Sequence, residues 1–126
     1  MRYLALACGY DGTLAHDGLV ASTTLAALRR LLDSGRRLIL VTGRERDDLQ
    51  KIFPHFRLFV WLVVENGAVL YDPARKREKI LGGRPSQAFI DRLSERGVEP
   101  LAVGRVIVAT WQRHETAVRD TIRECG

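Results

Sequence analysis

Three apolar runs in the first half of the chain lack polar alternation. They span residues 3–8, 37–42 and 58–64, and branched or aromatic side chains dominate the second and third. A strand with one solvated face alternates apolar and polar residues, whereas a parallel strand covered on both faces does not. The pattern therefore predicts three parallel strands buried on both faces. Trp61 and Trp111 each lie in an apolar predicted strand, so both are expected to be packed.

Amphipathic spacing between these runs predicts two helices. Apolar positions recur at helical intervals over residues 25–32; Ser22 is a residue type that caps helix N-termini, and Gly35 is expected to end the helix. Residues 44–52 form a second, shorter predicted helix that Pro54 stops. The order strand, helix, strand, helix, strand predicts right-handed crossovers and a Rossmann-like parallel α/β sheet.

The pattern changes after Gly67. Two short apolar segments flank a turn at residues 72–73 and predict a hairpin, and the glycines and proline at residues 82–85 are typical of a hinge. Beyond the hinge we expect a helix, a strand and a helix, at residues 86–96, 105–111 and 115–124. The chain is therefore expected to divide into a core at residues 1–82 and a smaller α+β unit at residues 83–126.

The charge of the chain brings nucleic acid into consideration as a partner. The formal net charge is +5 and the pI is about 9.8, mostly from arginine. Acidic residues are interspersed, and no aromatic residues alternate with the basic ones, so nucleic-acid binding is disfavoured. No apolar run approaches the length of a membrane span, and Met1 does not open a signal peptide. We expect a cytoplasmic protein with no membrane partner, and with Cys8 and Cys125 reduced.

Polar and glycine residues follow each of the three apolar runs, at residues 9–13, 42–44 and 65–67. Because the carboxyl ends of parallel strands meet at one edge of a sheet, these loops are expected to be neighbours. Together they hold a carboxylate, two hydroxyls, an arginine, an amide and glycine-flanked N–H groups, and the start of the second helix adds positive potential. Such a set suits a phosphate. Each loop alone is weak evidence for a phosphate site, because Asp-Gly-Thr and Asn-Gly also occur in ordinary turns.

With YDGTLA at residues 10–15, LILVTGR at 38–44 and VENGA at 64–68, the chain resembles a known family. It is similar to the N-terminal half of a haloacid dehalogenase (HAD) superfamily phosphatase, of the Cof-like group with an inserted cap. The resemblance covers essentially the whole chain and implies a HAD-like core followed by a partial cap. It also implies a Mg²⁺-dependent phosphomonoesterase, in which one aspartate attacks phosphorus and a second, two residues later, shuttles the proton. The implied ligand is a small phosphorylated metabolite or inorganic phosphate.

The resemblance assigns roles to individual residues. Asp11 matches the proton-shuttling aspartate and, through its main-chain carbonyl, a magnesium ligand. Thr42 matches the hydroxyl that holds the transferring phosphoryl group. Gly9 stands at the position of the nucleophile, so an anionic metal ligand is lost there as well. The implied phosphate-binding residues are Gly12, Thr13, Thr42, Gly43, Arg44 and Asn66.

The glycine at position 9 has two consequences. Phosphoryl transfer by the family's mechanism is expected to be abolished or strongly impaired, and Mg²⁺ affinity is expected to fall. One negative charge fewer beside a dianion favours phosphate capture without turnover. An enzyme and a non-catalytic phosphate-binding or protein-interaction module derived from the HAD fold therefore both stay open. So do the simpler interpretations of Asp11 as a turn cap, Thr42 as a structural hydroxyl and Arg44 as a solvated side chain.

The end of the chain carries a further expectation. The family's third and fourth motifs, a lysine and an acidic pair, follow the cap, whereas residue 126 lies within it. The resemblance therefore implies a truncated HAD fold, in which the first strand, central in the family, becomes an apolar sheet edge. Such an edge invites pairing with another chain, so we expect a homodimer or a partner chain that covers residues 3–8.

Overall fold

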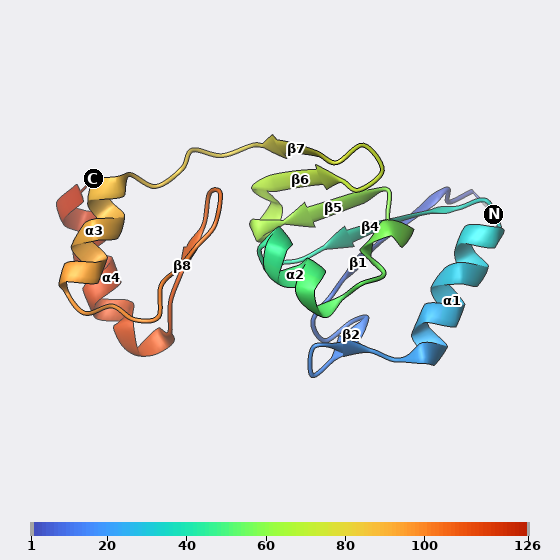
Figure 1. The fold of residues 1–126 in the computed structure, drawn as a ribbon, viewed down its shortest axis with the longest axis horizontal. Helices are drawn as coiled ribbons and strands as arrows, with labels where there is room; N and C mark the ends of the chain where they lie inside the picture. Colours follow the sequence, from blue (N-terminus) through green and yellow to red (C-terminus); the bar gives the residue numbers. More distant parts are fainter. Residues whose placement is uncertain (1, 126) are drawn as a thin grey trace. The chain divides into compact units, whose positions relative to one another are not determined.

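The chain forms two compact units, which divide between Leu81 and Gly82. A five-stranded sheet lies at the centre of the first unit. The computed structural model describes residues 2–125, and its strand order is β1-β4-β5-β6-β7 (Figure 1). These strands are β1 (Ala5–Gly9), β4 (Arg37–Val41), β5 (Trp61–Val64), β6 (Val69–Asp72) and β7 (Arg77–Ile80). β1, β4 and β5 are parallel, and β6 and β7 are antiparallel additions. The predicted α/β class and three-stranded parallel half-core are confirmed.

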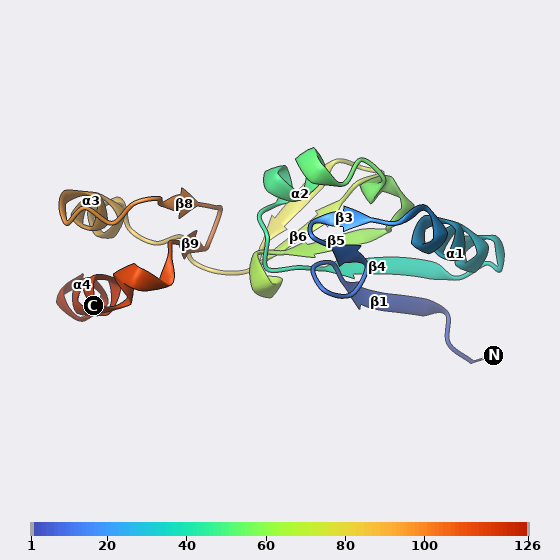
Figure 2. The ribbon, with the colours of Figure 1, turned by 90° about the horizontal axis from the view of Figure 1, so that it is seen from below.

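Two helices cover one face of this sheet (Figure 2). They are α1 (Ser22–Asp33) and α2 (Arg46–Ile52), which bury Leu28 and Leu49 respectively. The sheet side chains with no exposed surface on this face are Leu38, Leu40, Leu62, Val64 and Val69. Three aromatic rings pack beside them, with centroids 5.4 Å apart for Tyr10 and Phe53 and 6.0 Å apart for Phe53 and Phe59. Burying each such side chain contributes about 1.5–3 kcal/mol, so this layer is the core of the first unit.

The opposite face of the sheet is uncovered within residues 2–81. Val41 and Trp61, which alternate with the buried leucines along β4 and β5, are each 40% exposed. The expectations that these strands are covered on both faces and that Trp61 is packed are therefore wrong for this part of the chain. The physical reason is that α1 and α2 lie on the same side of the sheet, so every second side chain of β4 and β5 points away from them.

β1 forms one edge of this sheet, and β4 is its sheet neighbour in the described part of the chain. Leu4 is 78% exposed and Leu6 is 45% exposed. No charged residue occurs from residue 3 to residue 10. Natural edge strands usually carry charges, prolines or bulges that discourage pairing, and this segment has no charge or proline. The predicted apolar edge is confirmed.

A small hairpin that the sequence analysis missed follows the first loop. Its strands are β2 (Ala15–His16) and β3 (Leu19–Val20), which pair antiparallel. Asp17 and Gly18 connect them with φ values of 51° and 80°, as a tight Asp-Gly turn requires. The Tyr10 hydroxyl donates a 2.7 Å hydrogen bond to the Gly18 carbonyl and so fastens the hairpin to the core. The predicted cap at Ser22 is wrong, because Ala21 precedes the helix and no side chain caps it.

The second unit contains a pair of helices and a short hairpin. They are α3 (Gln87–Glu95), α4 (Glu115–Cys125), β8 (Ala102–Val103) and β9 (Val108–Ala109). The Ser86 side chain caps α3 by accepting the Phe89 N–H at 3.2 Å. The strand expected at residues 105–111 is present but shorter, as β9, because a turn closed by a hydrogen bond from Gly104 N–H to the Ile107 carbonyl takes up its first residues. Trp111 is 58% exposed, so its expected packing is also wrong.

Short 3-10 turns occur at Phe56–Leu58, Glu65–Gly67 and Gln112–His114. Within residues 2–125, none of the helices has both the length and the apolar character needed to cross a membrane. The turn at Glu65–Gly67 matters most for function, since it follows β5 at the edge of the sheet where the three predicted loops lie.

Candidate functional site

The loops that follow β1, β4 and β5 meet at one edge of the sheet. Asn66 N–H donates to the Thr42 carbonyl at 3.2 Å, and Glu65 N–H donates to the Arg44 carbonyl at 3.0 Å. The side chain of Arg44 reaches back to Asp11 in the first loop. The structure therefore brings together Asp11, Thr42, Arg44 and Asn66, four of the five polar residues that the sequence analysis placed in these loops. Their roles in binding stay predictions.

Thr42 lies directly after β4, and only 7% of the residue is exposed. Its Oγ1 accepts the main-chain N–H of Arg44 at 3.1 Å. This bond uses an acceptor position of the hydroxyl and leaves its hydrogen free to donate. Thr42 therefore shapes the turn and also offers a donor toward the loops.

Gly43 and Asn66 lie so close that a larger side chain at position 43 would have to displace the Asn66 side chain. A Cβ atom there would lie 2.6 Å from Asn66 Oδ1. Asn66 is the middle of three successive left-handed residues, with φ values of 50°, 56° and 93° at Glu65, Asn66 and Gly67. Asparagine and glycine adopt this conformation readily. The Asn-Gly pair, ordinarily a hairpin signal, here directs an amide onto the loop after β4.

Arg44 connects the first two loops through a bidentate ion pair. Its Nε and Nη2 atoms lie 2.7 and 2.9 Å from the two carboxylate oxygens of Asp11. Its Nη1 atom donates to Asp48 Oδ2 at 2.8 Å, across one turn of the chain. Two carboxylates of the same chain therefore hold the guanidinium. The side chains are partly open to solvent, with exposures of 31% for Arg44 and 50% for Asp11.

These contacts set the protonation state of the cluster. The hydrogen bonds from Arg44 hold the pKa of Asp11 below its usual range. The hydrogen bonds to Asp11 and then to Asp48 raise the pKa of Arg44. Both members of the Asp11–Arg44 pair are therefore charged at neutral pH. A carboxylate in this state has no proton to donate, and its arginine partner disfavours the uptake of one.

Gly9 ends β1 beside Val41 of β4, directly before the first of the three loops. A Cβ atom at residue 9 would have Thr13 Oγ1 as its nearest neighbour, at 3.3 Å. The Val41 carbonyl and the Thr13 Cβ atom would each lie 3.8 Å away. There is therefore space for a Cβ atom, provided that the threonine hydroxyl yields by a few tenths of an ångström.

Several loop N–H groups are already used within the protein. Gly12 N–H donates to the Ala15 carbonyl at 3.0 Å, and Thr13 N–H donates to the Tyr10 carbonyl at 3.2 Å. The N–H groups of Arg44 and Asn66 also have acceptors, as described above. The predicted contribution of glycine-flanked amides is thereby reduced. An anion at this edge would depend mainly on side-chain donors.

Carboxylates surround the loop after β4. Asp47 and Asp48 lie in the first turn of α2. Burial, and then repulsion from Glu65 and Asp48, raises the pKa of Glu45. A helix N-terminus favours anions, but α2 has only seven residues and an acidic first turn. Its field is therefore largely offset, and the expected positive potential from the start of this helix is small.

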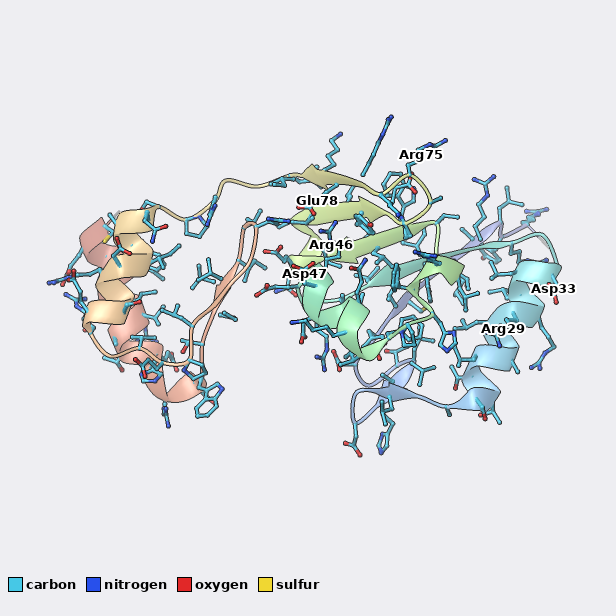
Figure 3. All side chains as sticks on the ribbon, in the orientation of Figure 1. Arg29, Asp33, Arg46, Asp47, Arg75 and Glu78 are labelled. Atoms are coloured by element: carbon cyan, nitrogen blue, oxygen red, sulfur yellow. The ribbon has the colours of Figure 1, made fainter. Side chains whose placement is uncertain are left out.

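Arg46 is held differently from Arg44. Figure 3 shows Arg46 beside Asp47 and directed toward Glu78 of β7, and the Arg46 Nη1 atom lies 3.1 Å from the Glu78 carboxylate. Its guanidinium carbon lies 4.3 Å from the centroid of the Tyr71 ring. These contacts tie α2 to the β6–β7 hairpin. Arg46 is thus engaged on the hairpin side, while Arg44 faces the loops.

The described residues do not fit a magnesium site. Among residues 2–125, no three His, Cys, Asp or Glu side chains are grouped so that they could hold a metal ion. Position 9 offers no carboxylate, and both oxygens of Asp11 contact Arg44. The remaining carboxylates near this edge belong to the loop after β4 and to α2. We therefore assign no step to a metal in this chain.

Comparison with known proteins places the fold in a family. A family model for haloacid dehalogenase-like hydrolases matches residues 6–102. The chain belongs to the haloacid dehalogenase-like hydrolase family. The match includes all three loops described above. It confirms the resemblance drawn from the sequence motifs.

Individual relatives agree with this assignment. The HMP-PP phosphatase of Yersinia pestis (strain Pestoides F) is 38% identical over 71 residues, which is 56% of this chain and 26% of that protein. A solved haloacid dehalogenase-like hydrolase from B. subtilis is 28% identical with a TM-score of 0.59, covering 78% of this chain and 34% of that one. A Thermoplasma acidophilum protein shares the fold, with a TM-score of 0.66 at 18% identity, covering 100% of this chain and 59% of that one. The chain shares ancestry with HAD-like phosphatases and spans only part of their length.

Sequence reasoning missed one member of the cluster around Arg44. Asp48 follows Arg44 by four residues, a spacing at which oppositely charged side chains commonly pair near a helix. That signal was present in the sequence. The contact between Gly43 and Asn66 had no such signal, because it depends on three successive left-handed residues after β5.

Proposed function

We propose that this chain is a HAD-like phosphatase domain that retains its phosphate-binding loops and is inactive, or strongly impaired, in phosphomonoester hydrolysis. The observation that carries the proposal is Gly9 at the end of β1, beside loops that still contain Asp11, Thr42 and Arg44. Hydrolysis by the family's mechanism needs a carboxylate at position 9 to attack phosphorus. Without it, the loops can hold an oxyanion that they cannot cleave.

The proposed ligand is inorganic phosphate or a small phosphorylated metabolite. Arg44 would contact it through its guanidinium, Thr42 and Thr13 through their hydroxyls, and Asn66 through its amide. Gly12 and Gly43 would let the main chain approach. The relative from Yersinia pestis is named for its action on HMP-PP, which supports a phosphorylated ligand for this chain. Planar arginine is well suited to phosphate oxygens because its donors are arranged in a fork.

The proposed catalytic deficit extends to the cofactor. HAD phosphatases generally use Mg²⁺, and the resemblance assigns it to the Asp11 main-chain carbonyl and to the carboxylate that Gly9 lacks. Hard cations are held through oxygen ligands, so losing an anionic one lowers affinity. We propose that the affinity of this chain for Mg²⁺ is strongly reduced, since its described residues offer no complete magnesium site. Asp11 then occupies the position of the proton-shuttling residue in a chain that does not catalyse the reaction.

Two measurements test this function. The chain is expected to bind inorganic phosphate in isothermal titration but to show no turnover of a generic phosphate ester with Mg²⁺. Arg44→Met is expected to abolish the binding, while Arg46→Met, a matched loss of charge two residues away, is expected to retain it. Turnover that clearly exceeds the background reaction would contradict the proposal. Phosphate binding that persists in Arg44→Met would contradict the assigned site.

A partner for the β1 edge is the second part of the proposal. We propose that a second copy of the chain covers this edge in a homodimer, since the segment is uncharged and exposes Leu4 and Leu6. Light scattering at tens of micromolar is expected to give twice the monomer mass. Ala5→Lys places a charge on the edge and is expected to give monomers, whereas Ala27→Lys, on an exposed position of α1, is expected to leave the dimer intact. A stable monomer at that concentration would contradict the proposed homodimer.

The alternative function is a non-catalytic protein-interaction module. The uncovered sheet face with Val41 and Trp61, next to the β1 edge, favours it. The two functions differ in their dependence on Arg44, because a protein-interaction role does not require phosphate. The cytoplasm stays our proposed compartment, based on two cysteines that are not bridged to each other. The proposed role of residues 83–126 is that of a partial cap.

A further inference from the structure

The edge of the Arg44 guanidinium that is best suited to bind an oxyanion is already occupied by Asp11. The Nε and Nη2 atoms form the fork that binds two oxygens of one oxyanion side by side. Both atoms donate to the two oxygens of Asp11, at 2.7 and 2.9 Å. The remaining Nη1 atom donates to Asp48 at 2.8 Å. A phosphate that approaches this edge therefore meets a fork that an internal carboxylate has filled.

We propose that Asp11 is a built-in competitor for the oxyanion site, a latch that phosphate must displace from Arg44 before it binds. The inference rests on the proposed phosphate binding and adds its regulation. Asp11 imitates the ligand, because a carboxylate and a phosphate present two oxygens to the guanidinium in the same way. In the latched state Arg44 is neutralised. In the open state it offers its fork to the ligand.

The geometry allows the latch to open without disturbing the fold. Half of the Asp11 side chain and about a third of the Arg44 side chain are exposed, so the pair is a weak surface interaction. Asp11 is followed by Gly12 with φ of 75° in a turn, not by a packed element. When Asp11 leaves, Asp48 still holds Nη1 from α2. Asp48 is therefore a positioning residue that keeps Arg44 at the edge of the loops.

The absence of a carboxylate at Gly9 leaves Asp11 as the acidic residue of the loop after β1 that contacts Arg44. The latch therefore depends on one side chain, and a single substitution opens it. Asp11→Asn keeps the size of the residue and removes the charge and one acceptor oxygen. Asp48→Asn removes the same charge from the same guanidinium without freeing the fork. Comparing the two variants distinguishes two effects on phosphate affinity. Asp11→Asn frees the Nε and Nη2 donors of Arg44, whereas Asp48→Asn only removes a nearby negative charge.

The test is titration of inorganic phosphate into the wild-type chain and both variants by calorimetry at low ionic strength. Asp11→Asn is expected to bind phosphate about tenfold more tightly than wild type, since both competition and repulsion are removed. Asp48→Asn removes repulsion but keeps an amide oxygen that can still accept from Arg44 Nη1, and it is expected to change the affinity by no more than about threefold. Equal tightening in both variants would overturn the latch and leave only an electrostatic effect. Weaker binding in Asp11→Asn would also overturn it, because Asp11 would then assist the ligand.

A second readout reports on the latch itself. In ¹⁵N NMR spectra, the Arg44 Nε–H signal is expected to exchange slowly with water in the wild type and to lose that protection in Asp11→Asn. Added phosphate is expected to restore protection in Asp11→Asn. An Nε–H signal that is equally unprotected in the wild type would overturn the latch. If phosphate binds none of the three proteins while wild-type Nε–H is protected, the proposed function fails and the internal ion pair stands without a ligand to compete with.

Discussion

The contact between Gly43 and Asn66 offers a direct test of the site geometry, because it joins the loops after β4 and β5. Gly43→Ala adds one methyl group at a position that lies 2.6 Å from Asn66 Oδ1. Ordinary contacts between such atoms are longer than 3.4 Å. The asparagine must therefore move, or the two loops must separate. Either change disturbs the edge where the phosphate is proposed to bind.

The magnitude follows from two opposing terms. Forcing a methyl group into a filled position destabilises a protein by about 1–3 kcal/mol. Gly43 does not have a left-handed backbone, so alanine adopts its conformation without strain and gains about 0.4–1 kcal/mol from the unfolded state. Gly43→Ala is therefore expected to destabilise the first unit by about 1.3 kcal/mol, the difference between the midpoints, within limits of about 0–2.6 kcal/mol. In an Asn66→Gly background the overlap is gone, and the same substitution is expected to stabilise by about 0.4–1 kcal/mol.

Urea unfolding of the wild type, Gly43→Ala, Asn66→Gly and the double variant measures both the expected loss of stability and the expected gain. A Trp111→Phe background leaves Trp61 as the fluorophore of the first unit, so the readout follows the sheet and not the helix pair. Glycine at position 66 is compatible with the observed φ of 56°, which makes it a better control than alanine. If Gly43→Ala has the same effect in both backgrounds to within about 0.5 kcal/mol, the two residues are not coupled and the described packing is refuted.

Three further predictions concern the same region. Gly9→Asp is expected to change the free energy of unfolding by less than about 1 kcal/mol, because its Cβ atom meets only a hydroxyl at 3.3 Å; a larger loss in thermal denaturation would show that the space is filled. The pKa of Asp11 is lowered in the folded chain, so its ion pair stabilises above the usual aspartate pKa of about 4 and is lost as pH falls through the lower folded value. Wild type and Asp11→Asn are therefore expected to differ by at most about 1 kcal/mol at neutral pH and to converge in acid, and a gap that widens in acid would contradict this sign. Arg46→Met is expected to lower stability by about 1–2 kcal/mol in urea unfolding, through loss of a ring contact and an ion pair, and Arg75→Met on the exposed hairpin should be closer to neutral.

The parallel half of the sheet could be predicted from the sequence because its signals are local and redundant. Each strand is an uninterrupted apolar run, and each is followed by a break with glycine. What covers these strands could not be predicted in the same way. An apolar run indicates burial on both faces, yet Trp61 and Val41 are 40% exposed because both helices of the first unit lie on the other side. The hydrophobic pattern shows which side chains a strand could bury. It does not show whether a helix or another layer covers each face of the sheet.

The site shows a similar division. Its residues could be located from the sequence, since parallel strands bring their carboxyl ends together whatever the side chains are. Their contacts could not be located, because these depend on backbone conformations that the motif does not specify. Asn66 reaches Gly43 through consecutive left-handed residues, and the N–H groups of Gly12 and Thr13 turn inward to their own loop. The same motif that suggested free amides thus uses them to close a turn.

The basic character of the chain does little to attract an anion to this site. The arginines at residues 29, 30, 36 and 37 lie on α1 and at the start of β4, whereas Thr42 lies after the end of that strand. Five residues of strand separate the two ends by about 16 Å, twice the distance over which physiological salt screens exposed charges. The charges nearer to this edge include the carboxylates of Glu45, Asp47 and Asp48, and Arg46 is already paired with Asp47 and Glu78. Oxyanion binding at this edge must therefore draw on short-range hydrogen bonds from Arg44 and the hydroxyls. A net charge of +5 thus says little about how this edge of the sheet would attract an anion.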